Sequence, residues 1–431
     1  MSEHTARIAR RSIGRRGFLG TVGTGAAALA GCLGGGDDDV VRIGHLAPRE
    51  LDMGIGATRS AEMAVEEVND DGGIMDRDVE LVAEDSAGVP SEASTKAQEM
   101  VQQEDIDVMI GTFVSEVALG IIDFLADQQV PFIVSGSASP EITRDHAGQD
   151  YEQYRNVFRV NSINTNFQAE ALADYAEFLA DEHGWNSFAV TPENAAWTQP
   201  FSEILPAQLE ERGLEVALDA RIARDTDDFT PVLDQVEASG ADVMLKTFAH
   251  IPGPGMLSTW RQNEYPFAQE GINVASMSPQ FWDDTGGGCL YETTAESGAG
   301  GTATVTEKTI PFTDDYQERY EDRPTAPMYM GFGSYDAVHI YREAVERAGT
   351  ADYAEDPDAF VDAMLETDHV GTAGRIQFFG SDHEFPHDVK PGLDFAPFPV
   401  QQWQESGGGE KVCTFPREIA TDDHVMPEWL A

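Results

Sequence analysis

Asp-Val-Met-Ile-Gly-Thr-Phe-Val-Ser, residues 107–115, is the stretch that decides the fold class of this 431-residue chain. Residues 107–110 are a short apolar run typical of a buried strand, residues 111–115 form a turn, and residues 116–128 follow as a helix. The same succession of strand, turn and helix recurs between residues 40 and 248. Such strict alternation with short connections predicts a doubly wound α/β fold, in which helices cover both faces of parallel sheets.

The length of the chain indicates two such lobes. Without an N-terminal signal about 400 residues remain, which is more than one hydrophobic core usually supports. Folded sequence is expected to begin at Val40 with a strand, and apolar spacing predicts a helix over residues 57–69. Gly54-Ile55-Gly56 is interpreted as the loop that enters this helix, because the glycine spacing of a dinucleotide site is incomplete there.

The N-terminal residues 1–32 predict where the protein works. Arg15-Arg16-Gly17-Phe18-Leu19 is typical of a twin-arginine export signal, and Leu29-Ala30-Gly31-Cys32 is typical of a lipobox. The apolar run between them is shorter than the roughly 20 residues of a membrane span. Cleavage before Cys32 would leave a cysteine that accepts a diacylglyceryl group, with residues 33–39 as a flexible spacer. We therefore expect a globular protein anchored by this lipid outside the cytoplasmic membrane.

The charge of the chain is strongly acidic, with 77 Asp and Glu against 27 Lys and Arg and a formal net charge of −50. Dense surface carboxylates hold water and cations in concentrated salt, so this balance resembles that of a protein from an extreme halophile, of haloarchaeal type. Nucleic acid is excluded as a partner, because too little positive charge is available to neutralise phosphates.

Two neighbouring strand-to-helix turns are the best candidate for a binding site. Ser115 is placed to cap the helix that follows the first turn, and Ser139 precedes Pro140 at the start of the next helix. Together with Ser137 and Ala138, these turns would bring backbone N–H groups, hydroxyls and helix N-termini to one place. That arrangement suits an anionic group such as a carboxylate. The alternative is that each serine only caps its own helix.

Several short motifs, loose individually but specific in their order and spacing, resemble one known family. They are Val41-Arg42-Ile43-Gly44, residues 64–74, Asp85, residues 110–115, residues 136–143, Asp228-Phe229-Thr230-Pro231, Ala241-Asp242-Val243 and residues 333–349. In this order they resemble the type I periplasmic binding proteins of ABC transporters, in the branch that binds leucine, isoleucine and valine. The resemblance extends from about Val41 to about Cys413, nearly the whole chain after the signal.

The resemblance implies two α/β lobes joined by a three-strand hinge, with a small solute bound between them. On this basis lobe 1 is expected to comprise residues 40–158 and 305–385, and lobe 2 residues 159–304 and 386–431. The family also implies an ABC permease as partner, a monomer, and no enzymatic activity, cofactor or metal. An exported hydrolase is the rival class, but the sequence offers it neither an activated nucleophile nor a metal site. A ligand sensor built on the same fold stays open.

The family also implies particular ligand contacts. Ser115 and the backbone near Ala138 would hold a ligand carboxylate, and Trp197 would cover the ligand from the second lobe. Gln280 stands where the family carries the acid that holds an ammonium, and Met53 stands where it carries a tyrosine. Amino-acid binders usually have threonine at the position of Ala138. These departures disfavour a free amino acid as the ligand relative to a related small solute. Amides, urea and dicarboxylates are the alternative ligands.

The remaining expectations concern the two serines beside Ala138, one strand of the second lobe and two cysteines. Ser137 or Ser139 could replace the missing threonine hydroxyl. The loop after Phe248 is expected to close over the ligand, which makes Phe248 a candidate contact. The strand that ends at Phe248 also carries Lys246, which either faces the cleft or is a solvated edge residue. Cys289 and Cys413 either form a disulfide, since the compartment is oxidising, or are two small buried residues.

Overall fold

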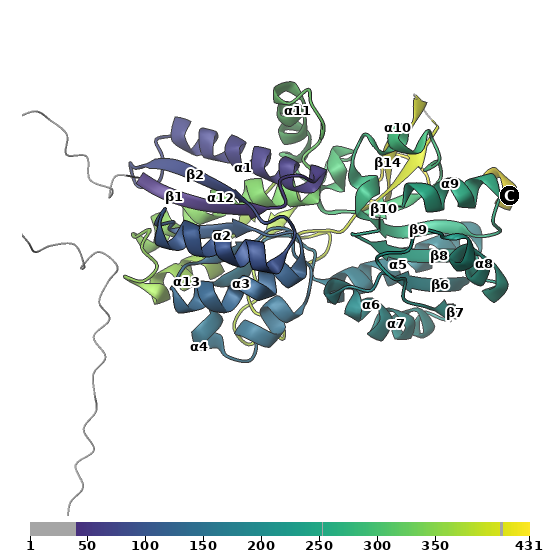
Figure 1. The fold of residues 1–431 in the computed structure, drawn as a ribbon, viewed down its shortest axis with the longest axis horizontal. Helices are drawn as coiled ribbons and strands as arrows, with labels where there is room; N and C mark the ends of the chain where they lie inside the picture. Colours follow the sequence, from purple (N-terminus) through teal and green to yellow (C-terminus); the bar gives the residue numbers. More distant parts are fainter. Residues whose placement is uncertain (1–39, 252, 406–407) are drawn as a thin grey trace, which may run out of the picture. The chain divides into compact units, whose positions relative to one another are not determined.

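A computed structural model describes residues 40–251, 253–405 and 408–431. The twin-arginine signal, Cys32 and the spacer lie outside these residues. The first lobe is built on a parallel sheet with the strand order β2-β1-β3-β4-β5. Figure 1 shows β1 and β2 of this sheet beside each other. Its strands are β1 (Val40–Ala47), β2 (Asp78–Asp85), β3 (Val108–Gly111), β4 (Phe132–Val134) and β5 (Val157–Arg159).

Helices cover both faces of this sheet. They are α1 (Asp52–Asp70), α2 (Pro90–Gln102), α3 (Ser115–Asp127), η3 (Ile142–Ala147), α4 (Tyr151–Tyr154), α12 (Met328–Ala348) and α13 (Pro357–Leu365). The helix α11 (Thr309–Arg319) packs against α1 and α12 instead of the sheet. Successive residues of a strand point to opposite faces. In β3, Val108 and Ile110 pack in the core that contains α1, α12 and α13, whereas Met109 packs in the core that contains α2 and α3. The apolar run of β3 is therefore buried on both sides, as predicted for a doubly wound sheet.

The second lobe repeats this construction on a parallel sheet with the order β7-β6-β8-β9. Its strands are β6 (Ser187–Pro192), β7 (Glu215–Asp219), β8 (Val243–Phe248) and β9 (Ala268–Asn273). Its helices are α5 (Thr165–His183), η4 (Ala196–Thr198), α6 (Gln199–Glu203), α7 (Leu205–Glu211), α8 (Thr230–Ser239), α9 (Pro254–Gln262), η5 (Val274–Met277) and α10 (Phe281–Thr285). The predicted α/β fold with two parallel sheets is confirmed.

The described chain passes between the two sheets three times, after β5, before α11 and before β13. A small antiparallel sheet joins the second lobe, with β10 (Thr293–Ala295), β13 (Val400–Gln404) and β14 (Glu410–Phe415). The remaining short elements are η6 (Ser297–Gly301), β11 (His369–Val370), β12 (Arg375–Ile376) and η8 (Glu428–Leu430). Asp388 bridges to Arg159 of β5, and Val389 packs in the first-lobe core. The chain thus stays with the first sheet beyond the boundary after residue 385 that the sequence predicts.

The two described cysteines are free thiols, so the disulfide considered from the sequence is not formed. Cys289 packs in the second-lobe core, and Cys413 packs in a separate small cluster with Ala299 and Ala303. Burial raises the pKa of each thiol to about 12. The alternative of two small buried residues describes them correctly. Among the residues that the structure describes, no helix combines the length and the apolar character needed to cross a membrane.

Candidate ligand-binding site

A pocket that is partly open to solvent lies between loops of the first lobe and loops of the second, and the empty space in and over it amounts to about 430 Å³. Its wall is mostly apolar and aromatic. The lining residues are Phe113, Val114, Ser115, Gly136, Ala138, Ile163, Gln168, Trp197, Ala249, His250, Ile272, Val274, Met277, Tyr329 and Phe398. None of these lining residues, within the described part of the chain, is Asp, Glu, Lys or Arg. The apolar and aromatic wall with few polar groups is typical of a small-molecule site.

The first-lobe side of the pocket is formed by the turns after β3 and β4. The two turns touch, because a Cβ added to Gly136 would lie 2.7 Å from the carbonyl oxygen of Thr112. Ser115 is the first residue of α3, and no side chain caps the N-terminus of this helix. The N–H of Val117 donates to the carbonyl oxygen of Val114, so the N–H groups of Ser115 and Glu116 are the first-turn donors left at the positive end of the helix dipole.

The hydroxyl of Ser115 is held in place by the neighbouring turn. Its Oγ accepts a hydrogen bond of 3.1 Å from the backbone N–H of Ser139. A serine hydroxyl that accepts one bond still has its own hydrogen to donate. Ser115 is only 2% exposed, so it would donate this hydrogen inside the pocket. The turn can therefore offer a hydroxyl and helix N–H groups to one anionic group.

Ser137 and Ser139 have structural contacts instead of lining the pocket. The Ser137 hydroxyl lies 2.9 Å from that of Thr112 and donates to the carbonyl oxygen of Val114 at 3.2 Å. The Ser139 hydroxyl accepts the backbone N–H of Glu141 at 3.3 Å. Both serines thereby brace the two turns. Ala138 does line the pocket.

The second-lobe side carries Trp197 and His250, which are both oriented by the buried carboxylate of Glu193. Glu193 Oε1 accepts the indole N–H of Trp197 at 2.9 Å and lies 2.5 Å from Nδ1 of His250. Its Oε2 accepts the backbone N–H groups of Ala249, His250 and Ile251 at 3.0, 2.8 and 3.3 Å. Burial acts to raise the pKa of Glu193, but the hydrogen bonds that the carboxylate accepts from the side chain and backbone of His250 and from Trp197 outweigh burial and lower the pKa overall.

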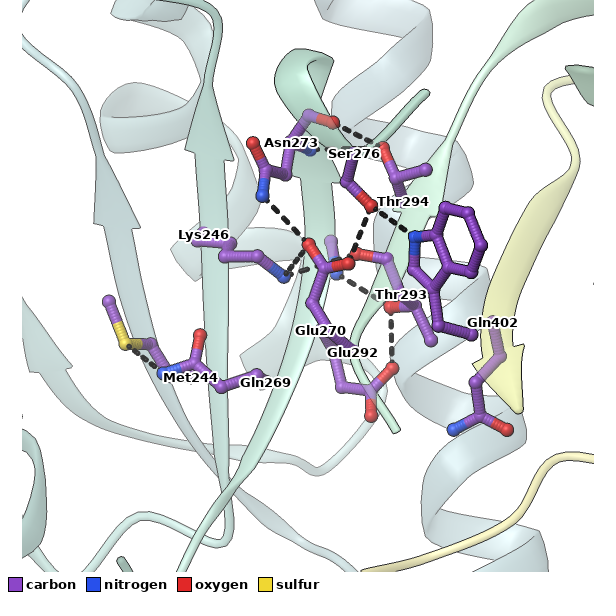
Figure 2. A network of polar contacts seen from close by, with 12 residues as sticks. Met244, Lys246, Gln269, Glu270, Asn273, Ser276, Glu292, Thr293, Thr294 and Gln402 are labelled. Carbon is purple, nitrogen blue, oxygen red and sulfur yellow. Dashed lines mark hydrogen bonds and ion pairs between the residues drawn. The ribbon is translucent and has the colours of Figure 1, made fainter. Parts of the chain in front are cut away.

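Lys246 does not face the pocket. It is fully buried, and its Nζ lies 3.3 Å from Glu292 Oε1 and donates to the carbonyl oxygen of Thr293 at 3.1 Å (Figure 2). Glu292 also accepts hydrogen bonds from Asn273 at 2.9 Å and Ser276 at 2.6 Å. Lys246 therefore lies neither in the pocket lining nor at a solvated edge, because a buried carboxylate and the adjacent backbone hold it inside the second lobe.

Three other candidates also lie outside the lining. Phe248 is fully buried in the second-lobe core, and Met53 is buried in the core beside α2 and α3. The amide of Gln280 donates to the hydroxyl of Thr325 at 2.8 Å, so it makes a contact between the lobes. Of the expected ligand contacts, Ser115, Ala138 and Trp197 line the pocket.

Sequence reasoning missed several lining residues, above all His250, Gln168 and Tyr329. His250 lies in the loop after β8, where binding sites of parallel sheets are expected, but no local motif distinguishes it. Tyr329 comes from α12 and donates its hydroxyl to the carbonyl oxygen of Gly136 at 2.8 Å. Its separation of 193 residues from that turn leaves no signal in the sequence.

Arg323 connects the lobes beside the pocket. Its guanidinium lies 2.7 Å from Asp52 of α1 and 2.8 Å from Asp284 of α10. A second cross-lobe pair joins Arg224 to Glu116 at 3.5 Å. Both pairs are partly exposed, so salt screens them.

Comparison with known proteins gives a consistent picture. A sequence model of the family described as "Periplasmic binding protein" matches residues 40–392. The chain is 25% identical over 343 residues to "Leu/Ile/Val-binding protein homolog 3" of Brucella melitensis, an alignment that covers 78% of this chain and 84% of that protein.

Solved structures share the fold. A branched-chain amino acid transporter substrate binding protein from Streptococcus pneumoniae, in complex with isoleucine, superposes with a TM-score of 0.68 at 17% identity over 87% of this chain and 99% of its own. A solute binding protein from R. palustris, in complex with 4-hydroxybenzoate, has a TM-score of 0.71 at 16% identity over 91% and 99%. The family resemblance seen in the sequence is confirmed, and this chain belongs to the periplasmic binding proteins, a family of extracytoplasmic solute-binding proteins and not of enzymes.

Proposed function

We propose that this protein is the solute receptor of an ABC importer and binds an amino acid or a related small carboxylate between its lobes. The observation that carries the proposal is the pocket between the lobes, where Ser115 and the N-terminus of α3 face an apolar wall. The names of the relatives support an amino-acid-like solute, and the aromatic acid in one neighbour also carries a carboxylate.

Binding would proceed by closure of the lobes. The first lobe would take the carboxylate at Ser115 and the first-turn N–H groups of α3, and the second lobe would then cover the apolar body with Trp197. Closure expels water, and each fixed donor counts for more in a dry pocket. The ligand thereby shifts the population toward the closed form, which the permease would recognise.

The pocket favours this ligand class over the other solutes considered. Urea or a small amide would leave the wall of Phe113, Ile272, Val274 and Phe398 uncovered. A dicarboxylate would bring a second charge, for which no cationic side chain is among the lining residues of the described chain.

The location of the receptor is part of the proposal. A lipid on Cys32 would hold the monomer on the outer face of the cytoplasmic membrane, and the acidic surface would suit concentrated salt. Expression of a Cys32→Ser variant in the source organism tests the anchor. It should move the protein from the membrane fraction to the medium, and retention in the membrane would refute the anchor.

A thermal-shift screen in molar salt tests the receptor function, with amino acids, aliphatic and aromatic acids, dicarboxylates, amides and urea as probes. A ligand at 100 times its dissociation constant stabilises the folded state by about 2.7 kcal/mol. We expect carboxylates with an apolar body to raise the melting temperature. A screen in which only urea or amides do so would refute the proposed ligand class.

A further inference from the structure

The carboxylate of Glu193 is saturated with hydrogen bonds from the protein. One oxygen faces the indole N–H of Trp197 and Nδ1 of His250, and the other accepts three consecutive backbone N–H groups. A carboxylate has about four lone-pair sites, so five N–H groups leave none for a ligand. Glu193 is itself fully buried and absent from the pocket wall. It therefore acts on the pocket only through the two side chains that it orients.

His250 links Glu193 to the pocket, because its ring contacts the carboxylate on one side and lines the pocket on the other. Its Nδ1 is bound to Glu193 at 2.5 Å, which makes Nδ1 the protonated nitrogen of the neutral ring and leaves Nε2 as an acceptor. This Nε2 atom is buried and has no hydrogen-bond partner in the described part of the chain. Buried polar atoms usually have partners, so an unmatched acceptor in a pocket wall indicates a donor that the ligand brings.

Gln168 adds a second acceptor of the same kind. It lies in the first turn of α5 and lines the pocket, and its buried Oε1 also has no partner within the described residues. The pocket thus offers a ligand two uncharged acceptors on the side of α5 and β8, and an anion-binding turn at Ser115. No lining residue in the described part of the chain offers a free carboxylate.

We propose that the ligand is an apolar carboxylic acid whose second polar group is a hydroxyl and not an ammonium, and that His250 accepts this hydroxyl. The inference rests on the proposed receptor function and narrows its ligand class. A hydroxyl needs one acceptor, which His250 Nε2 supplies. An ammonium needs three acceptors and a counter-charge. The carboxylate of Glu193 cannot serve as this partner, because five N–H groups of the protein already occupy its oxygens. Glu193 is the positioning residue, and His250 is the residue that determines specificity.

Matched acids that differ only in one substituent test this inference. Leucine, 2-hydroxy-4-methylpentanoate and 4-methylpentanoate share a carboxylate and a branched body, and phenylalanine, 3-phenyllactate and 3-phenylpropanoate form an aromatic series. Calorimetry on the purified protein in molar salt should give, in the better-binding series, a hydroxy acid that binds at least ten-fold more tightly than the amino acid. The unsubstituted acid should lie between them.

The variant His250→Phe tests the residue and keeps a ring beside Phe113, with His339→Phe on α12 as the matched control. The affinity ratio of hydroxy acid to unsubstituted acid should fall toward one in His250→Phe and stay as in the wild type in the control. A residue with a merely structural role would weaken both acids together and leave the ratio unchanged. Glu193→Gln should also lower the ratio, because one amide oxygen cannot accept both side-chain donors and the three backbone N–H groups.

The outcomes separate the inference from the proposed function. If an amino acid binds as tightly as its hydroxy analogue or more tightly, the inference is overturned and the receptor function stands. If both acids keep their affinity ratio in His250→Phe, the role of His250 is overturned. If none of these acids or amino acids binds, the proposed ligand class fails and the inference fails with it. The wild-type comparison decides the ligand class even if a variant does not fold.

Discussion

Loss of the Arg323 guanidinium should weaken ligand binding without any contact to the ligand. Arg323 is anchored to Asp52 in the first lobe and pairs with Asp284 in the second through two contacts, Nη1–Oδ1 at 3.0 Å and Nη2–Oδ2 at 2.8 Å. Its side chain is 48% exposed, so solvent weakens the ion pair across the lobes, and the pair stabilises the closed form less than a buried pair would. Exposed pairs contribute 0.2–1 kcal/mol, and the two-pronged geometry favours the upper end, about 1 kcal/mol.

This energy exists only where the lobes are together, so it favours the closed form. Removing about 1 kcal/mol from the closed form lowers the apparent affinity about five-fold where the open form predominates without ligand. The assay is calorimetric titration of Arg323→Gln with the tightest acid, at about 0.1 M and about 1 M salt. The Debye length falls from about 10 Å to about 3 Å between these concentrations, so the loss should shrink at high salt.

Arg375 supplies the matched control. It pairs with Asp368 inside the first lobe and is 49% exposed, so Arg375→Gln removes a similar ion pair that does not cross the lobes. Its affinity should stay at the wild-type value. Equal affinities for Arg323→Gln and the wild type at low salt, or an equal loss in Arg375→Gln, would refute the reasoning.

Three other outcomes follow from the structure. Trp197 lines the pocket, so its fluorescence should change on saturation with ligand. If a Trp197→Phe variant keeps the full fluorescence change, another tryptophan is responsible and the prediction for Trp197 is wrong. Lys246→Met should destabilise the fold by about 3–5 kcal/mol in chemical unfolding because it leaves Glu292 buried without its cation, and the added change Glu292→Gln should restore part of the loss; equal stability of the single variant and the wild type would contradict the buried pair. Cys289 and Cys413 should both react with a thiol label in unreduced, denatured protein, whereas a lack of reaction would indicate a disulfide.

Sequence reasoning was most successful where the pattern is local and repeated. The run at residues 107–110 was predicted as a strand, and β3 covers Val108–Gly111. The helix predicted over residues 57–69 is longer in the structure, because α1 begins at Asp52. Gly54 lies inside this helix, where a Cβ would come within 2.1 Å of the carbonyl oxygen of Pro48. In the sequence, the glycines of this first helical turn were interpreted as a loop that enters the helix. The structure shows that Gly54 is needed inside the helix for close packing against Pro48.

From residue patterns alone the site was predictable only on its first-lobe side, and Trp197 on the second-lobe side was expected from the family resemblance. The two turns are adjacent in the sheet because β3 and β4 pair, which the β–α alternation implies. The second-lobe side depends on Glu193 and His250, which are 57 residues apart and joined by the fold. Lys246 was ambiguous because its buried partner Glu292 belongs to a segment outside the alternating pattern.

The central claim is that a ligand carboxylate binds at Ser115 between the lobes. Calorimetric titration of the tightest acid into the wild type, Ser115→Ala and Ser91→Ala tests it most directly, since Ser91 is an exposed serine near the start of α2, outside the pocket. A hydrogen bond to a charged group contributes about 1.5–3 kcal/mol, so Ser115→Ala should bind at least ten-fold more weakly. Its melting temperature without ligand should fall, because the buried N–H of Ser139 loses its acceptor, but the variant should still unfold in one cooperative transition. Ser91→Ala should match the wild type. An unchanged dissociation constant in Ser115→Ala would contradict the claim.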